Sequence, residues 1–500
     1  MKNLAGKAVL VLGLGSSGLA LARWCVRCGA QVTVADTRAE PPQREALLAS
    51  CPTASFVQAD MAAALLDRGP FSMVFKSPGL SPASIADVTT VAVARGLVVG
   101  NELSLFSQAL VDLKADAAYV PQVIGITGTN GKTTVTSLTG QLVERAEKTV
   151  AVAGNIGPTL LDTLAARLDA DNLPEVWVLE LSSFQLDGIK NFEPTAATVL
   201  NITQDHLDWH DTFDGYVAAK SNVYGGGGAM LLNRQDSLVM AALPVAAKGK
   251  ALRSYLTYGH DEPQRPGDYG IENVNGMAWL VRAMEADETI KKKRGQQTAD
   301  VELHIQRLMP VDALRIHGLH NATNALAALA LAGSAGCALS LMLHGLREYR
   351  GEAHRVESIA VINGVEYFDD SKATNVGATV AALSGLGPGR KLVVILGGVG
   401  KNQDFSPLVA PVSQYVQTVI LIGRDASLIK AVLSGNDVKL MVADGMQHAV
   451  ELAAAQAQSG DAVLLSPACA SFDMFDNYEH RARVFCEAVQ ALALDEGVAL

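Results

Sequence analysis

Two glycine-rich loops constrain the fold of this chain more than any other feature. VLGLGSSGLA spans residues 11–20 and GITGTNGKTT spans residues 125–134, and each lies between a short apolar run and a helix-like segment. Strand–loop–helix units of this kind build parallel sheets, because the chain must cross back over the sheet before its next parallel strand. Further apolar runs, such as QVTVAD, VWVLEL and KLVVIL, are followed by polar or glycine residues in the same way. The pattern predicts an α/β protein.

Chain length and the positions of these units predict three domains. The 500 residues correspond to about three domains at roughly 150 residues each. We expect a Rossmann-like N-terminal domain over 1–100, a central P-loop ATPase domain with a mainly parallel sheet over 101–351, and a Rossmann-like C-terminal domain over 352–500. In the last of these, VESIAVINGVEYF predicts a hairpin with Asn363-Gly364 as its type I′ turn.

Two segments stand apart from this alternation. Residues 235–300 read as an irregular peripheral insertion, with a solvated charge run from Lys291 to Arg294. The uncharged run over residues 325–343 approaches the length of a membrane span, but Gly333 and Gly336 interrupt it. We therefore expect two packed core helices there and no membrane segment.

Composition excludes several classes of protein. Hydrophobic residues make up 49% of the chain and charged residues 18%, which is typical of a globular protein. The net charge of -11 argues against a general nucleic-acid binder, which usually carries a basic surface. MKNLAGKAVL runs straight into a strand without a signal peptide, so a cytoplasmic protein is expected. Cys25 and Cys28 form a lone CxxC inside a predicted helix, which favours ordinary thiols over a metal or redox site.

The first glycine loop has the GxGxxG spacing of a nucleotide site, with Gly13, Gly15 and Gly18 between a strand and a helix. Asp36 closes the next strand, where an acid that binds a ribose would lie. The glycines allow the backbone to approach a pyrophosphate, and the helix N-terminus favours its charge. These residues alone leave open a dinucleotide, another nucleotide such as a nucleotide sugar, or a plain tight turn.

The second loop is a variant phosphate loop. Gly131, Lys132 and Thr133 follow a strand and open a helix, although Ile126 stands where the strict pattern has its first glycine. Lys132 can reach the β- and γ-phosphates of a nucleotide, and the Thr133 hydroxyl can bind Mg²⁺. The loop predicts binding of a nucleoside triphosphate.

Acidic and histidine side chains follow two later strands. Glu180 comes directly after VWVL, while Asp205, His206, Asp208 and His210 come shortly after ATVLNI. Ligands of parallel sheets gather at the carboxyl ends of the strands, and carboxylates with some imidazole suit a divalent cation. We predict a metal or phosphate role for Glu180 and His206, and a supporting role for Asp208 and His210.

The third domain adds a polar set suited to a small anionic substrate. It comprises Asp369 to Lys372 in FDDSKATN, Lys401 in GGVGKNQDF and Ser471 in SPACASFDMF, each after a strand. Lysine and hydroxyl groups of this kind stabilise charge that builds on a phosphate. Arg355, in AHRVE, is a further candidate for a nucleotide contact. Lys220, on a predicted helix in YVAAKSNVY, reads from its pattern alone as a surface lysine.

Taken together, these motifs resemble those of a known family. TGTNGKTT, GNIG, ELSSFQL, NITQDHLDWH, GLHNATNALAALA, AHR, DDSKATN, GGVGKNQDF and SPACASFDMF occur in this order. The set is similar to that of the Mur ligases of bacterial peptidoglycan synthesis, over nearly all of the chain outside residues 235–300. Asp36, the SPG at residues 77–79 and SPACASFDMF most resemble the D-glutamate-adding members.

The resemblance implies a function. It implies an ATP-dependent ligase that adds D-glutamate to UDP-N-acetylmuramoyl-L-alanine through an acyl phosphate, with release of ADP and phosphate. The first loop would then hold the UDP of the substrate and the second ATP with Mg²⁺. We expect a cytoplasmic monomer whose partners are these three substrates, without nucleic acid or membrane. A nicotinamide oxidoreductase, the main alternative for the first loop, would leave the other two domains without a task.

The resemblance also implies roles for individual residues. ATP phosphates would be held by Gly128, Thr129, Asn130, Gly131, Lys132, Thr133 and Thr134, and the rest of the nucleotide by Asn321, Asn324, Arg355 and Asp370. Magnesium would be bound by Thr133, Glu180, His206 and Lys220, the last as a carbamate. The implied catalytic residues are Lys132, Glu180, His206, Lys220, Lys372 and Lys401.

The same resemblance assigns the other substrates. Uridine and diphosphate would contact Ser16, Ser17, Asp36, Thr37, Arg38 and Gly79, and the reacting end would contact Asn155 and Ser182. The D-glutamate pocket would comprise Lys372, Thr374, Lys401, Ser471, Phe472 and Tyr478. Ser16, Ser17 and Tyr478 depart from the residues most usual in the family at these places.

Overall fold

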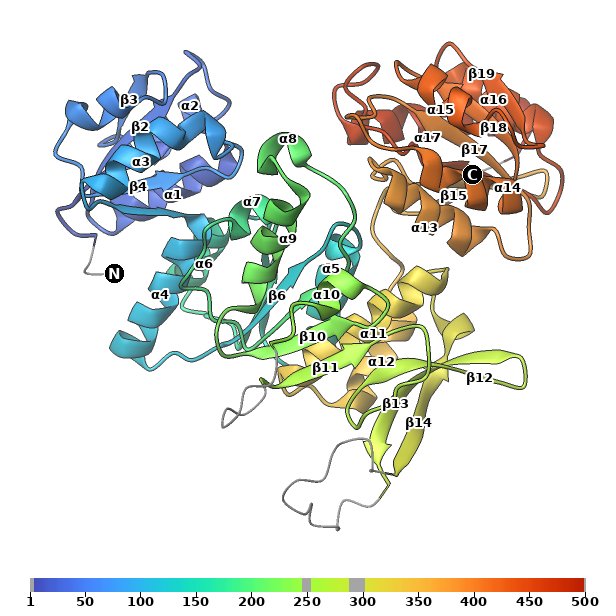
Figure 1. Cartoon of the computed structure of the whole chain (residues 1–500), viewed down its shortest axis with the longest axis horizontal. Coiled ribbons are helices and arrows are strands. Elements are labelled where there is room, and N and C mark those ends of the chain that lie inside the picture. The colour runs from blue at the N-terminus through green and yellow to red at the C-terminus, as the bar shows by residue number, and fades with distance from the viewer. Residues whose placement is uncertain (1–3, 245–252, 287–301, 499–500) are drawn as a thin grey trace. The chain divides into compact units, whose positions relative to one another are not determined.

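The computed structural model of the chain describes residues 4–244, 253–286 and 302–498. These residues form two compact units (Figure 1). One unit comprises residues up to 309 together with 325–346, and the other comprises 310–324 and the residues from 347 onward. The first unit holds two sheets and the second unit holds one.

The first sheet carries the first glycine loop. Its five parallel strands lie in the order β3-β2-β1-β4-β5. They are β1 (Ala8–Leu12), β2 (Gln31–Asp36), β3 (Ser55–Gln58), β4 (Met73–Lys76) and β5 (Val98–Asn101). The helices are α1 (Ser16–Arg27), α2 (Arg44–Ser50), α3 (Ala86–Ala94) and α4 (Glu102–Ala117), which follows β5 directly. This is the predicted Rossmann-like arrangement, with the loop at the carboxyl end of the central strand.

The second sheet carries the phosphate loop. Its nine strands lie in the order β14-β13-β12-β11-β10-β9-β6-β8-β7. They are β6 (Gln122–Thr127), β7 (Val150–Gly154), β8 (Val176–Glu180), β9 (Ala196–Val199), β10 (Ala229–Asn233), β11 (Tyr255–Tyr258), β12 (Tyr269–Val274), β13 (Met277–Glu285) and β14 (Leu303–Pro310). The helices are α5 (Lys132–Arg145), α6 (Leu160–Asp169), α7 (Ser183–Leu186), α8 (Leu207–His210), α9 (Phe213–Ser221) and α10 (Ser237–Met240). Strands β6 to β11 pair in parallel, as predicted.

The expectation of an irregular segment over 235–300 is wrong for its described part. Helix α10 and strands β11, β12 and β13 occupy it, and they extend the second sheet at one edge. Figure 1 shows β12 to β14, in yellow-green and yellow, at this edge. Sequence patterning missed them because most of these strands are only half-buried and their apolar residues are interspersed with charged ones. The charge run from Lys291 to Arg294 lies outside the described residues.

The uncharged run over residues 325–343 falls in two helices, as predicted. Helices α11 (Leu319–Ser334) and α12 (Leu339–Glu348) are separated by a turn in which Gly336 has a φ of +77°. Every residue from 325 to 332 is buried, so the alanines serve close helix packing. Among the residues that the structure describes, no helix is long and apolar enough to cross a membrane.

The two sheets of the first unit share one hydrophobic core. Helices α1, α4 and α6 contact one another, and their apolar side chains join a cluster that includes residues of both sheets. The Phe106 ring on α4 meets the Trp177 ring on β8 edge-on, with centroids 5.1 Å apart. Cys25 on α1 is buried in the same cluster, and burial raises the pKa of its thiol to about 12, in line with the prediction of an unreactive thiol. The core therefore fixes the first glycine loop relative to the second sheet.

The second unit contains a six-stranded sheet in the order β15-β16-β20-β17-β18-β19. Its strands are β15 (Glu357–Ile362), β16 (Val365–Asp369), β17 (Leu392–Gly397), β18 (Val416–Ile422), β19 (Lys439–Val442) and β20 (Ala462–Leu465). Its helices are α13 (Val376–Leu386), α14 (Val409–Tyr415), α15 (Ala426–Leu433), α16 (Met446–Gln456) and α17 (Tyr478–Asp495). The predicted hairpin is confirmed, because β15 and β16 pair antiparallel and Asn363 and Gly364 both have positive φ.

The first glycine loop needs glycine for steric reasons. A Cβ built on Gly18 lies 2.0 Å from the carbonyl oxygen of Gly13, whereas a Cβ on Gly15 comes no closer than 4.0 Å to the Ser77 hydroxyl. Gly13 itself has a φ of +84°, which L side chains rarely adopt. The start of α1 can therefore approach the end of β1 only with a glycine at position 18.

Gly18→Ala tests this packing. The added methyl group must push α1 away from β1, so we expect the free energy of unfolding to fall by about 1–3 kcal/mol. Gly15→Ala is the matched control, since its methyl group has room, and it should change stability by less than about 1 kcal/mol. Urea denaturation of the two variants measures the difference. Equal midpoints would contradict the steric explanation.

Candidate active site

The second glycine loop is hydrogen-bonded to Asn201, which lies just after the neighbouring strand β9. Gly131, with a φ of +82°, precedes α5, and the loop lies between β6 and that helix. The Thr129 N–H donates to the Asn201 carbonyl at 2.9 Å. The Asn201 side chain accepts from the Asn130 N–H at 2.8 Å and donates to the Asn130 carbonyl at 3.0 Å. Asn201 follows β9 and was not singled out from the sequence, although it is the first residue of NITQDHLDWH.

Lys132 folds back over this loop. Its Nζ donates to the carbonyl oxygens of Gly128 and Thr129 at 2.8 and 2.9 Å. Thr133 and Thr134 lie next to it in the first turn of α5 and are buried. The ammonium group therefore rests where a loop that cradles phosphate directs its lysine, and phosphate oxygens can replace the carbonyls as its acceptors.

Lys220 is a buried residue, which corrects the surface position expected from its pattern alone. Only 2% of the residue is exposed. Its Nζ donates to the Gly128 carbonyl at 2.8 Å and lies 4.7 Å from the centroid of the Tyr216 ring. Burial, together with the charge of Lys132, lowers the pKa of this amine well below its usual value, although Asp205 and Glu180 oppose the shift. The site therefore favours an uncharged amine at position 220.

Glu180 has one carboxylate oxygen that is buried without a hydrogen-bond partner in the described part of the chain. The residue ends β8 and is only 2% exposed. Oε1 accepts from Asn155 Nδ2 at 2.7 Å, while Oε2 is buried and has no hydrogen-bond partner within the described part of the chain. A buried carboxylate oxygen without a partner is costly unless a cation or donor meets it. This oxygen suits a cation, so Glu180 is a candidate metal ligand.

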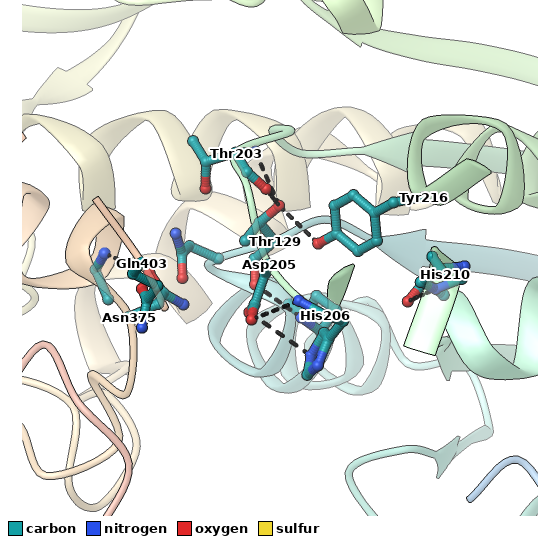
Figure 2. Close-up of polar contacts among 12 residues, drawn as sticks. Thr129, Thr203, Asp205, His206, His210, Tyr216, Asn375 and Gln403 are labelled. Atoms are coloured by element: carbon teal, nitrogen blue, oxygen red, sulfur yellow. Dashed lines mark hydrogen bonds and ion pairs between the residues drawn. The ribbon is translucent and has the colours of Figure 1, made fainter. Parts of the chain in front are cut away.

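His206 lies on the loop that follows β9 (Figure 2). The loop is held because Thr129 Oγ1 donates to the Thr203 carbonyl at 3.1 Å and lies 2.8 Å from the Tyr216 hydroxyl. The Asp205 carboxylate accepts from the His206 N–H at 2.9 Å and lies 3.6 Å from its Nε2. About 38% of the His206 side chain is exposed, so a ligand can reach its ring.

These residues meet because of the strand order. Glu180 ends β8, the phosphate loop follows β6, and residues 201–206 follow β9. Strand β6 lies between β8 and β9 in the sheet. The structure thus brings together Lys132, Glu180 and Lys220 of the predicted set, with His206 on the adjoining loop. His210 differs from them: its Nε2 lies 2.9 Å from the Ser183 hydroxyl. Burial lowers the pKa of its ring to about 4, so a neutral His210 supports the loop structure.

At the first glycine loop, the carboxylate of Asp36 holds the loop in place by hydrogen bonds. Its carboxylate accepts from the Leu14 N–H at 2.8 Å, from the Arg38 N–H at 3.0 Å, and from Arg38 Nε and Nη2 at 2.9 and 2.8 Å. The Arg38 guanidinium lowers the pKa of Asp36 to about 2. The other predicted residues of this site are accessible at the same edge of the sheet, namely Ser16, Ser17, Thr37, Arg38 and Gly79. Asp36 therefore holds the first glycine loop in place. It also lies at the position expected for an acid that binds a ribose.

In the second unit, two buried side chains, those of Asp370 and Arg481, make hydrogen bonds to the loops that carry the predicted site residues. Asp370 accepts from the Ser466 hydroxyl at 2.7 Å, and burial raises the pKa of Asp370 to about 7. Arg481, which the sequence did not suggest, is 1% exposed and donates to the carbonyls of Cys469 and Ser371 at 3.0 and 2.7 Å. It thereby joins the segment that carries Lys372 to the one that carries Ser471.

The remaining predicted residues of the second unit have varied surroundings. Lys372 Nζ lies 5.0 Å from the centroid of the Tyr478 ring, and Thr374 N–H donates to the Lys372 carbonyl at 2.9 Å. Phe472 is 73% exposed, whereas Ser471 is buried. Lys401 is exposed and has a φ of +50°. Arg355 lies between two residues of positive φ, and Asn324 donates to Asn321 at 3.2 Å.

Two predicted substrate contacts already have structural partners in the first unit. Asn155 holds Glu180, as described above. The Ser182 hydroxyl accepts from the Gln185 N–H at 3.2 Å and so caps α7. Both side chains lie beside the metal-ligand candidate at the end of β8, so either can serve a substrate only in addition to these contacts.

Comparison with known proteins identifies relatives over the whole chain. The family model of the MurD-like N-terminal domain of Mur ligases matches residues 7–100, that of the Mur ligase middle domain matches 126–332, and that of the glutamate ligase domain matches 354–469. A UDP-N-acetylmuramoylalanine–D-glutamate ligase of Albidiferax ferrireducens is 62% identical and covers 100% of this chain and 99% of its own length. A protein of the same name from Ralstonia nicotianae is 54% identical and covers 100% and 99%.

Solved structures of similar fold are more distant in sequence. MurF of Acinetobacter baumannii is 19% identical, with a TM-score of 0.56, and covers 97% of this chain and 92% of its own. MurF of Thermotoga maritima in complex with ADP is 15% identical, with a TM-score of 0.56, and covers 99% and 97%. At these identities the likeness concerns the fold alone.

Asp36→Asn tests the fastening of the first loop. The folded pKa of Asp36, about 2, lies below its ordinary 3.8, so its carboxylate stabilises the fold above that ordinary value and loses this effect as the pH falls toward 2. Removal of the charge should lower the free energy of unfolding near neutral pH by about 2 kcal/mol, at about 1.4 kcal/mol per pKa unit. The deficit relative to the unmodified chain should shrink as the pH falls from about 4 to about 2. Asp60→Asn, at an exposed site of the same domain, is the control, and an equal deficit in both variants would count against this role.

Proposed function

The chain belongs to the Mur ligase family, and we propose that it is an ATP-dependent ligase that joins D-glutamate to UDP-N-acetylmuramoyl-L-alanine in peptidoglycan synthesis. Full-length relatives of this name, 54 to 62% identical, support this assignment. The structural observation that carries it is the cluster of Lys132, Lys220 and the open Glu180 oxygen around one phosphate loop. An enzyme of this kind would act as a cytoplasmic monomer.

The reaction has two steps. A carboxylate is a poor acylating agent, so its oxygen first attacks the γ-phosphorus of ATP and releases ADP, which gives an acyl phosphate. The amine of D-glutamate then attacks the acyl carbon, and the C–O bond to phosphate breaks as the amide forms. Two anions meet in the first step, so the site must offset their charges. Lys132 would do so by moving its donors from the loop carbonyls to phosphate oxygens.

A divalent cation would complete this charge balance. The residues proposed to hold it are Thr133, Glu180, His206 and Lys220, of which Glu180 has a suitable open oxygen. When bound, Mg²⁺ would neutralise charge on the phosphate oxygens. Lys220 is proposed to serve as a carbamate, because an uncharged amine can add CO₂ and an ammonium group cannot. Its burial beside Lys132 favours the uncharged form.

The remaining substrates are proposed to occupy the other predicted residues. In this proposal, residues 1–100 bind UDP at the first glycine loop, 101–351 bind ATP, and 352–500 bind D-glutamate. Lys372 and Lys401 would meet the carboxylates of the amino acid, together with Thr374, Ser471, Phe472 and Tyr478. Asn321, Asn324, Arg355 and Asp370 would contact the nucleotide. Asn155 and Ser182 would contact the reacting end of the sugar nucleotide.

A substrate panel tests the function directly. Purified protein receives ATP, Mg²⁺ and UDP-N-acetylmuramoyl-L-alanine with D-glutamate, L-glutamate, L-lysine or meso-diaminopimelate, and ADP release is measured. We expect turnover only with D-glutamate, and none when the sugar nucleotide is omitted. Lys132→Ala should abolish it with a nearly unchanged circular dichroism spectrum, because the variant loses a charge and two hydrogen bonds within one loop and no core packing. ADP release from ATP alone would instead indicate a nucleotide-driven switch.

Lys220→Ala tests the carbamate. The variant should lose activity by about 100-fold or more, since it removes a metal ligand, and added short carboxylates such as acetate should restore part of it. Carbon-13 NMR with labelled bicarbonate should show a carbamate signal in the unmodified enzyme and none in the variant. Lys190→Ala, at an exposed lysine, is the control. Normal turnover of Lys220→Ala without added carboxylate would exclude this role.

A further inference from the structure

Glu102 is a buried acid that the proposed reaction does not use. It is the first residue of α4 and follows the edge strand β5 of the first sheet. Asn101 fixes this position, because its side chain accepts from the Ser104 N–H at 3.1 Å and donates to the Gln185 carbonyl at 2.8 Å. Only 1% of Glu102 is exposed. The carboxyl group is thus held at a defined place between the two sheets of the first unit.

One oxygen of Glu102 caps a helix of the second sheet. Oε1 accepts from the Leu161 N–H at 3.0 Å, in the first turn of α6. Thr159, at the N-cap of α6, makes no side-chain capping bond of its own. The acceptor that the α6 N-terminus needs is therefore supplied from α4.

The other oxygen has no partner. Oε2 is buried and makes no hydrogen bond within the described residues. Burial and the charge of Asp162 oppose the charged form, while the N–H groups of Leu160 and Leu161 and the hydroxyl of Ser17 favour it. Burial prevails, and the pKa of Glu102 rises to about 7. A carboxyl group in this environment changes its charge near neutral pH.

The first glycine loop leads into the N-terminus of α1, close to Glu102. Ser17 belongs to the first turn of α1, which packs against α6. Farther along, Arg23 and Arg27 of α1 lie 3.4 and 2.7 Å from Asp162 and Asp169 of α6. Asp162 lies in the first turn of α6 and is paired with Arg23, whereas Glu102 reaches the same helix end without a cation partner.

We propose that Glu102 is a positioning residue for the sugar nucleotide, which fixes the α6 N-terminus and favours the diphosphate only in its protonated form. The inference rests on the proposed binding of UDP at the first glycine loop. Helix N-termini attract anions. A charged Glu102 already occupies that field and repels a diphosphate beside Ser16 and Ser17, whereas a neutral Glu102 keeps the cap on α6 without repulsion. Binding of the sugar nucleotide must then be coupled to uptake of a proton.

The sign of the pH dependence follows from this coupling. Below about pH 7 the carboxyl group is already neutral in the free protein, and binding costs no protonation. At higher pH the bound state must take up a proton, so affinity falls by about tenfold between about pH 6 and about pH 8. The diphosphate of UDP-N-acetylmuramoyl-L-alanine is esterified at both ends and does not titrate in this range. The ligand therefore does not mask the effect.

Isothermal titration calorimetry with UDP-N-acetylmuramoyl-L-alanine tests the proposal on the full chain and on Glu102→Gln. Glutamine keeps an acceptor for the Leu161 N–H but cannot ionise. We expect the variant to bind like the unmodified protein near pH 6, to lose the pH dependence, and to bind about tenfold more tightly than the unmodified protein near pH 8. Glu45→Gln, at an exposed site on α2 of the same domain, should keep the original dependence. An unmodified protein without pH dependence, or a glutamine variant that retains it, would overturn the proposal.

Glu102→Ala tests the positioning role in the enzymatic reaction. Loss of the α6 cap should raise the KM for the sugar nucleotide by about tenfold, which corresponds to about 1.4 kcal/mol, and leave the KM for ATP within about twofold. A merely structural role would change both constants together or neither. Failure of the unmodified protein to bind the sugar nucleotide at any pH would refute the proposed function itself. Binding that is unaffected in every Glu102 variant would refute only this inference.

Discussion

The concentration of positive charge at the phosphate loop is the constraint on which the rest of the site depends. Lys132 and Lys220 both donate to the single carbonyl oxygen of Gly128. Two ammonium groups so close in a buried place repel each other strongly. The repulsion is relieved if one amine is neutral, and burial selects Lys220, because Lys132 is only partly buried. Lys220 therefore favours the uncharged amine beside Lys132, which is the form that the proposed carbamate requires.

The strand order brings residues from three segments of the chain to the same edge of the second sheet. Residues that follow β8, β6 and β9 are far apart in sequence, yet these strands are neighbours. Asn201 links two of their loops by three hydrogen bonds, and Tyr216 and Thr129 hold the loop that carries His206. The supporting residues are neutral. They restrict the loops without adding charge, and one oxygen of Glu180 is left without a hydrogen-bond partner in the described part of the chain.

The sequence predicts those parts of the fold and site that depend on local spacing. The glycine loops, the parallel strands and the Asn363-Gly364 hairpin follow from short patterns whose steric requirements are local, as the contact between Gly18 and Gly13 illustrates. From its pattern alone Lys220 reads as a surface lysine, because the short pattern around it does not show which face of α9 is covered by the phosphate loop, and only the family resemblance predicts a role for it in the site. Strands β11 to β13 were missed because strands that are only partly buried carry polar residues among their apolar ones. Asn201 and Arg481 act through backbone groups of distant segments, and no spacing rule reveals such a partner.

Two carboxyl groups near the first glycine loop, those of Asp36 and Glu102, have different roles because the fold packs different partners around them. Asp36 accepts four hydrogen bonds, three of them from Arg38, and its pKa lies near 2. The Glu102 carboxyl group accepts from the Leu161 N–H in a buried place without a cation partner, and its pKa lies near 7. Asp36 is therefore charged at every physiological pH and can fasten the loop permanently. Glu102 can exist in two charge states at the end of α6, and the arrival of an anion at the loop can shift the balance between them. The difference arises from the partners that the fold supplies, because the ordinary pKa values of the two side chains are nearly the same.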